Sequence, residues 1–205
     1  MVYDPCIGQW DYVQEDVPMV PYVKANANMF GFNETFVEEL GRLHEACGYE
    51  QYLAEYMTFP AKGVQPTRLI NTSSDNPCDL FDLVSDEATR INPCFDIYEI
   101  NTFCPTPWDV LSEPSSVDYF SPYAWTVYFD RPDVKKAMHA PLNVTWSECS
   151  ENSVFVAGSE GPQAEGDLSA NPTEHVLPQV IEATNRVLIA NGDFDMIIIT
   201  NGKRR

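Results

Sequence analysis

Two aspartates, Asp193 and Asp195, are the side chains of this sequence best placed to do chemistry. They follow residues 186–190, a short and mostly apolar run that predicts a buried strand. Residues 177–185 precede it with a helical pattern, and a helix followed by such a strand is the unit of a parallel α/β sheet. Catalytic groups gather at the carboxyl ends of strands in these sheets. An aspartate there could hold a histidine imidazole in one tautomer and stabilise its protonated form.

The same short motif is compatible with other roles. Gly192 could adopt a positive φ in a plain turn, with the two carboxylates accepting hydrogen bonds from backbone N–H groups. A calcium loop is disfavoured, because the glycine and the later glutamate of an EF-hand are absent. A triad with Ser159 and His175 is compatible with the spacing. However, residues 157–161 lack the G-x-S-x-G pattern, and no apolar strand leads into them.

Three segments of the chain resemble the serine carboxypeptidase family. Residues 187–196 resemble its acid-bearing strand and turn, which ends in G-D-x-D. Residues 128–140 resemble its Y-x-N-R-x-D-V-x-x-A-L-H-A stretch, and residues 144–150 its W-x-x-C segment. The three occur in the family's order. The resemblance implies an α/β-hydrolase fold and a serine-type peptidase that releases C-terminal residues through an acyl-enzyme.

The resemblance makes Asp195 the triad acid, with Asp193 and Gly192 supporting the turn. The family's serine lies in a G-E-S-Y-A-G elbow, and this sequence contains no such hexapeptide. The family's histidine lies downstream of the acid, whereas this sequence continues for only ten residues beyond Asp195. We therefore expect the chain to be an incomplete piece of the family's domain, without peptidase activity by itself. The relatives' oxyanion-hole glycines would also lie upstream of Met1.

The three histidines are not expected to serve as the catalytic base. His44 lies among charged residues of a predicted helix, which places it at the surface. His139 ends the second family segment, where a packing or hydrogen-bonding role is expected. His175 lies in a polar loop or at a helix start.

By this resemblance, residues 1–205 form a single incomplete α/β-hydrolase domain. Residues from about 14 to 122 correspond to a helical, loop-rich, disulfide-bonded insertion subdomain. Residues from about 123 to 205 return to the core, a mostly parallel sheet flanked by helices. Such a partial sheet should expose apolar surface where the missing elements belong. The alternatives are a non-catalytic, glycosylated hydrolase-like binding protein, an acyltransferase on the same scaffold, and a structural glycoprotein with chance motif matches.

Local patterns predict the helices around these motifs. Residues 33–47 form the clearest one, with Asn33 as its N-cap and Gly48 just past its end. A second short helix is predicted over 50–57, whereas the recurring prolines of residues 58–122 predict loops. A further helix begins near Asp130, which is expected to cap it; Pro132 lies in its first turn and Val134, Ala137 and Met138 form its apolar stripe.

The cysteines and glycosylation sequons indicate the secretory pathway. N-x-S/T sequons begin at Asn33, Asn71 and Asn143, and the six cysteines lack C-x-x-C pairs or histidines at zinc spacing. We therefore expect disulfides rather than a metal site, and a secreted, vacuolar or lysosomal protein. The family resemblance implies that Cys149 and Cys6 have their disulfide partners outside this chain. The other four cysteines can then pair with one another in three different ways. The cysteines are Cys6, Cys47, Cys78, Cys94, Cys104 and Cys149.

The charge of the chain limits its partners. With 31 acidic against 12 basic residues, the net charge is −19, which disfavours nucleic acid and anionic lipid surfaces. No apolar run approaches membrane-spanning length, and the start shows no signal peptide. The acidic surface is compatible with an acidic working environment, or it serves solubility alone. We expect no cofactor; the partners of the complete enzyme would be peptide or protein C-termini, and the oligomeric state is not indicated.

Overall fold

The structure is a computed structural model that describes residues 2–3, 11–58, 62, 77–104, 128–146 and 175–200. The chain divides into two compact units. The first comprises residues 1–103 and 171–205, and the second residues 104–170. The predicted insertion over about 14–122 and the core over about 123–205 stay predictions.

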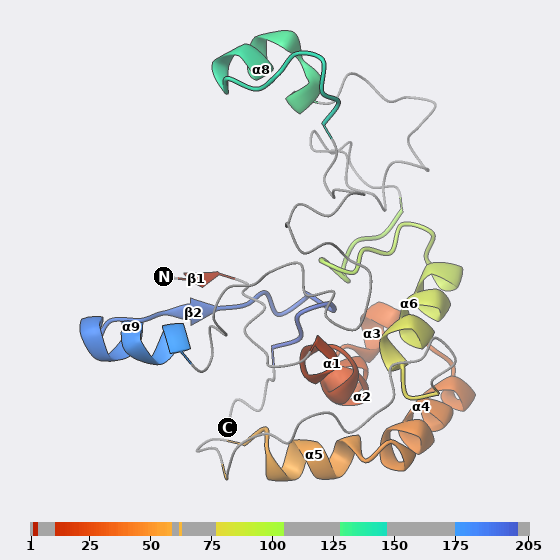
Figure 1. Ribbon diagram of the computed structural model, residues 1–205. Helices are drawn as coiled ribbons and strands as arrows, with labels where there is room; N and C mark the ends of the chain where they lie inside the picture. Colours follow the sequence, from red (N-terminus) through yellow and green to blue (C-terminus); the bar gives the residue numbers. More distant parts are fainter. Residues whose placement is uncertain are drawn as a thin grey trace, which may run out of the picture. The chain divides into compact units, whose positions relative to one another are not determined.

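Helices make up most of the described part of the first unit (Figure 1). Helix α2 contacts α1, α3, α4, α5 and α6, so it lies at the centre of this helical group. Its sequence is apolar on all sides, as a buried helix requires. The helices are α1 (Asp11–Gln14), α2 (Asp16–Ala25), α3 (Ala27–Phe30), α4 (Glu34–Ala46), α5 (Tyr49–Glu55), α6 (Leu80–Ile91) and α9 (Leu177–Thr184).

Helix α4 begins and ends as predicted. The Asn33 side chain accepts a hydrogen bond from the backbone N–H of Phe36 at 2.9 Å, which caps the helix. Gly48 follows the helix with a φ of 74° and lets α5 begin at once. His44, in the last turn of α4, is only 7% exposed, and its ring centre lies 5.9 Å from that of Tyr49 at the start of α5. The prediction that His44 is a surface residue was therefore wrong.

Helix α6 lies in the region predicted to be loops, and that prediction was wrong for these twelve residues. Leu80, Val84 and Ala88 are buried at helical spacing and pack into the core. The carboxylate of Asp79 caps the helix by accepting from the N–H of Asp82 at 3.0 Å. The sequence does contain the pattern of a capped helix, because Asp79 directly precedes apolar residues at helical spacing. The prolines on either side of this segment led to the prediction of loops.

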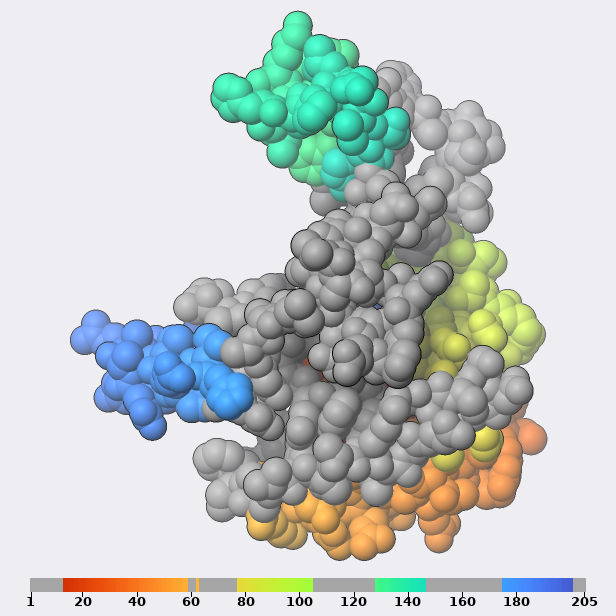
Figure 2. Space-filling model, viewed as in Figure 1, coloured from red at the N-terminus to blue at the C-terminus, as the bar shows by residue number. Residues whose placement is uncertain are grey.

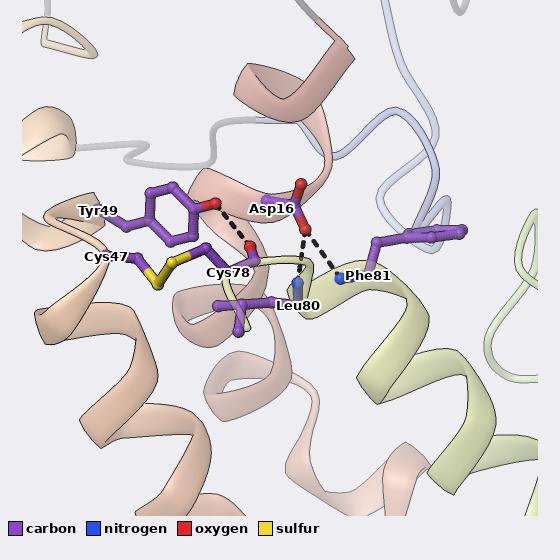
Figure 3. The surroundings of a disulfide bond; sticks show 6 residues. All are labelled: Asp16, Cys47, Tyr49, Cys78, Leu80 and Phe81. Atoms are coloured by element: carbon purple, nitrogen blue, oxygen red, sulfur yellow. Dashed lines mark hydrogen bonds between the residues drawn. A yellow bond between two sulfur atoms is a disulfide. The ribbon is translucent and has the colours of Figure 1, made fainter. Parts of the chain in front are cut away.

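A second carboxylate caps α6 from a distant part of the chain. Asp16, on α2, accepts hydrogen bonds from the N–H groups of Leu80 at 2.7 Å and Phe81 at 2.9 Å (Figure 3). Helix starts leave such N–H groups without intrahelical partners. Asp16 therefore fixes the start of α6 against the central helix.

A disulfide reinforces the same junction. Cys47, at the end of α4, is bonded to Cys78 before α6, with 5.7 Å between their Cα atoms (Figure 3). The hydroxyl of Tyr49 donates to the Cys78 carbonyl at 2.6 Å. Closing a loop with a sequence separation of 31 is worth about 3–4 kcal/mol. Cys94 and Cys104 are disulfide-bonded too, while Cys6 and Cys149 lie outside the described residues.

The sheet of the described residues has two parallel strands, β1 (Val2–Tyr3) and β2 (Ile189–Ala190). Val2 pairs with Ile189 and Tyr3 with Ala190. The predicted strand over 186–190 is thus shortened to two residues. The segment is also not buried, because no described element covers this face. Leu188, for example, is 57% exposed.

Helix α9 matches the helix predicted over 177–185, and none of its residues is buried (Figure 2, blue). Exposed apolar side chains gather along it and on the strand that follows. Apolar surface is thus exposed here, and its covering by further elements of the fold stays a prediction. These residues are Val176, Val180, Ile181, Leu188, Ile189 and Phe194.

The second unit contains the short helices η2 (Tyr128–Asp130) and α8 (Pro132–Ala137). Asp130 does not cap α8, contrary to prediction, because Arg131 occupies the cap position without a side-chain bond. The Asp130 carboxylate instead accepts from the Lys135 ammonium at 2.7 Å and from the Trp146 N–H at 2.8 Å. Phe129 packs on Trp146 with ring centres 5.4 Å apart. These contacts join the second and third family-like segments.

The end of α8 also departs from the prediction. Val134 is buried, but Met138 and Ala137 are exposed, so the apolar stripe is narrower than expected. His139 is exposed and has a φ of 58°, and its backbone N–H donates to the Lys136 carbonyl at 3.2 Å. Its role is therefore to end the helix through its backbone rather than to pack.

Asp16 should make the stability of the first unit depend on pH. Burial raises its pKa from 3.8 to about 6, against the hydrogen bonds from Phe81 and Leu80, and nearby Asp79 and Asp82 add to the rise. The folded state thus binds this proton more tightly than the unfolded chain does. The resulting stability is full below the unfolded pKa of 3.8 and is lost as the pH rises through about 6.

Asp16→Asn keeps an acceptor oxygen but cannot ionise. When the pH is raised from 4 to 7, the unsubstituted chain should lose on the order of 2 kcal/mol of unfolding free energy relative to Asp16→Asn. Urea unfolding at both pH values measures this difference. Glu38→Gln, at an exposed position on α4, is the control. Equal pH dependence of Asp16→Asn and the unsubstituted chain would contradict the account.

Candidate active site

Asp195 is the buried group of the turn that follows β2. It is 4% exposed, and its Oδ1 accepts hydrogen bonds from the N–H groups of Ile197 at 2.9 Å and Ile198 at 3.0 Å. This carboxylate therefore organises the backbone beyond it.

Gly192 does not supply the positive φ that the plain-turn interpretation required. Among the described glycines, positive φ values occur at Gly31 and Gly48. A Cβ at Gly192 would meet the Asp195 Cβ at 3.7 Å, an ordinary contact. The other half of that interpretation holds for Asp195, which does accept from backbone N–H groups.

Backbone hydrogen bonds fasten the turn to two other segments. The N–H of Ile100 donates to the Phe194 carbonyl at 3.1 Å, and the N–H of Met196 donates to the Ile97 carbonyl at 2.8 Å. The N–H of Ile199 donates to the carbonyl of Gln14, the last residue of α1, at 3.0 Å. Asp195 thus lies on a backbone held from both sides.

The two aspartates of the motif have different surroundings. Asp193 is exposed, whereas Asp195 is buried beside Met196, a core residue. Burial raises the pKa of the Tyr22 hydroxyl, and the charges of Asp195 and then Asp193 add to the rise. Tyr22 is a residue that the sequence analysis missed, since a tyrosine in an apolar helix carries no sequence signal for a site.

The remaining predicted residues are placed as follows. His175 is exposed just before α9, and Ser159 lies outside the described residues, so their triad with Asp195 is untested. The sequon residues Asn33 and Asn143 are exposed, and Asn71 lies outside the described part. Glycosylation stays a prediction.

A groove of about 390 Å³ lies among α2, α4 and α5. Lys24, His44 and Glu50 contribute polar groups to it. Burial lowers the pKa of His44, with Glu50 opposing and Lys24 adding to the effect. Over the ranges that the structure describes, no three potential metal ligands gather. No helix there combines the length and apolarity that crossing a membrane requires.

Comparison with known proteins decides the family. The sequence profile of the serine carboxypeptidases matches residues 1–205. This chain belongs to the serine carboxypeptidase family. It is 59% identical over 202 residues to serine-type carboxypeptidase F of Aspergillus niger. This alignment covers 98% of this chain and 38% of the relative. No solved structure matches the chain.

Two further relatives come from Arthroderma benhamiae. A probable serine carboxypeptidase is 40% identical and a carboxypeptidase Y homolog is 31% identical, each over 202 residues. Each alignment covers 98% of this chain and 36% of the relative. The carboxypeptidase-family chain therefore spans little more than a third of the length of these curated relatives.

The different surroundings of Asp195 and Asp193 predict different effects on stability. Asp195→Ala leaves the N–H groups of Ile197 and Ile198 without their acceptor, so it should cost about 1–3 kcal/mol of unfolding free energy. Asp193→Ala, at an exposed position in the same motif, should cost no more than about 0.5 kcal/mol. Urea denaturation of both variants measures the contrast. Equal losses would show that Asp195 does not organise the turn.

Proposed function

We propose that this chain is the acid-bearing part of a serine carboxypeptidase and that Asp195 is the acid of its triad. The observation that carries the proposal is the buried Asp195 carboxylate, held after a parallel strand in a turn fastened to two other segments. A triad acid needs this fixed backbone, because it must keep an imidazole in one orientation. Family membership supplies the reaction class.

The chemistry follows from what a fixed carboxylate can do. Asp195 accepts the Nδ1–H of the histidine, so Nε2 is left to remove the proton of the serine hydroxyl. The serine oxygen attacks the carbonyl of the last peptide bond, the C-terminal residue leaves, and water releases the acyl group. Asp195 stabilises the imidazolium in both steps without taking its proton. In this proposal, the serine and the histidine of the triad come from parts of the enzyme outside residues 1–205.

The finer fold is part of the same proposal. The parallel pair of β1 and β2 supports an α/β-hydrolase sheet, and the exposed apolar face of α9 and β2 would pack against the rest of it. Helices α2 to α6 then belong to the insertion subdomain of about 14–122. Asp193 and Gly192 are assigned to supporting the turn.

The setting of the enzyme is proposed to be the secretory pathway or an acidic vacuole. Disulfides support this, as do the exposed sequon residues Asn33 and Asn143. The raised pKa of Asp16, to about 6, favours a folded state at acidic pH. The substrates are peptide or protein C-termini.

The test is a chimera in which residues 1–205 replace the matching third of the A. niger relative. We expect it to release C-terminal residues from a blocked dipeptide, with labelling by a serine-reactive inhibitor. Asp195→Asn should lower kcat by about 10⁴, the loss known for a triad acid. Asp193→Asn is the matched control and should retain most of the activity.

The other outcomes discriminate among the alternatives. The 205-residue chain by itself should show no cleavage. A folded chimera that transfers acyl groups without hydrolysing the dipeptide would favour the acyltransferase. A folded chimera that does neither would favour the binding protein. Full activity of Asp195→Asn would remove Asp195 from the triad.

A further inference from the structure

The groove among α2, α4 and α5 is built from one side of each helix. The residues that line it are three or four positions apart on each helix, so successive turns of the same side face it. Its volume of about 390 Å³ lies in the range of small-molecule sites. The lining residues that matter most are Val20, Lys24, Gly41, His44, Glu50 and Leu53.

His44 is the buried polar residue of this groove. Its side chain is 7% exposed, and its Nδ1 has no hydrogen-bond partner among the described residues. Burial lowers the pKa of His44 and so favours the neutral ring, in which one nitrogen donates and the other accepts. A buried ring nitrogen without a partner costs free energy. A ligand that fills the groove would remove this cost.

Gly41 is a glycine that the helix itself does not require. It lies in the interior of α4, where glycine is less favourable than every residue except proline. Its φ is not positive, and a Cβ there would meet no atom within 4 Å. Neither the backbone conformation nor the packing therefore explains it. Gly41 lies one turn before His44, and its missing side chain leaves room in the groove beside the imidazole.

The charges around the groove select the class of ligand. Lys24 brings an ammonium, whereas Glu45 and Glu50 bring carboxylates. None of the three forms an ion pair with a described residue. Two carboxylates would repel a simple anion, and the ammonium would repel a simple cation. A ligand that carries both charges can pair with both signs, and Val20 and Leu53 offer apolar contacts to the rest of it.

We propose that this groove binds a free α-amino acid with an apolar side chain. The ligand carboxylate pairs with the Lys24 ammonium and accepts the Nδ1–H of His44, while the ligand ammonium pairs with Glu50. The apolar side chain contacts Val20 and Leu53. An amino acid of this kind is also what the proposed reaction releases, and only this link to the reaction rests on the proposed function.

Calorimetric titration of the 205-residue chain with L-leucine tests the proposal. We expect one site with a Kd on the order of 1 mM or below, as a ligand of this size can reach. L-Leucinamide lacks the carboxylate and N-acetyl-L-leucine lacks the ammonium, so each should bind about tenfold more weakly. Lys24→Met should weaken the binding of leucine about tenfold and leave that of leucinamide unchanged, because leucinamide has no carboxylate to pair.

Gly41→Met tests the position of the site. Its side chain fills the groove beside His44, so it should abolish leucine binding without lowering the melting temperature, since a good helix former replaces glycine. Ala46→Met adds the same side chain at an exposed position of α4 that does not line the groove, and it should bind leucine like the unsubstituted chain.

The chimera repeats the titration in a folded enzyme, after a serine-reactive inhibitor has blocked its active site. Absence of leucine binding to both preparations would overturn the inference. Binding that Gly41→Met leaves intact would overturn it as well, and so would equal affinities for leucine and leucinamide. Full activity of Asp195→Asn would instead overturn the proposed function and leave leucine binding unchanged, so the two failures are distinguishable.

Discussion

The hydrogen bonds of the Asp195 turn connect three segments that are distant in the sequence. The carboxylate orders the backbone after it, while Ile100, Met196 and Ile199 link the turn to residues 97–100 and to the end of α1. A short exposed strand such as β2 could not fix a carboxylate alone, since two residues of pairing are marginal. The position of Asp195 therefore depends on the helical group as much as on the sheet.

The helical group is in turn stabilised by its own long-range contacts. Asp16 on α2 caps α6, and the Cys47–Cys78 disulfide closes the same junction from the side of α4. These contacts fix the start of α6, and the same helix leads at its other end, Ile91, toward the segment of Ile97 and Ile100. A chain of ordinary packing and capping interactions thus runs from the disulfide to the candidate active site.

The sequence predicted the features that depend on local residues. Helix α4 was predicted because Asn33 and Gly48 mark its ends within the segment itself. The Asp195 motif was found because its residues are contiguous. Asp130 was assigned wrongly as a cap because its partners, Lys135 and Trp146, are chosen by the tertiary structure. No local pattern distinguishes these two uses of an aspartate.

Features that depend on distant residues escaped prediction. His44 is buried and lies beside Tyr49 of the next helix, α5, which the pattern of its own helix does not indicate. The capping of α6 by Asp16 spans more than sixty positions, with sequence separations of 64 and 65. The exposure of β2 likewise reflects what lies beside it rather than its own composition.

The most direct test of the central claim is a crystal structure of the active chimera. The account predicts that an Asp195 carboxylate oxygen lies about 2.6–3.2 Å from Nδ1 of the catalytic histidine, with Oδ1 still accepting from Ile197 and Ile198. A histidine paired with a different carboxylate, or an Asp195 with no imidazole near it, would contradict the account.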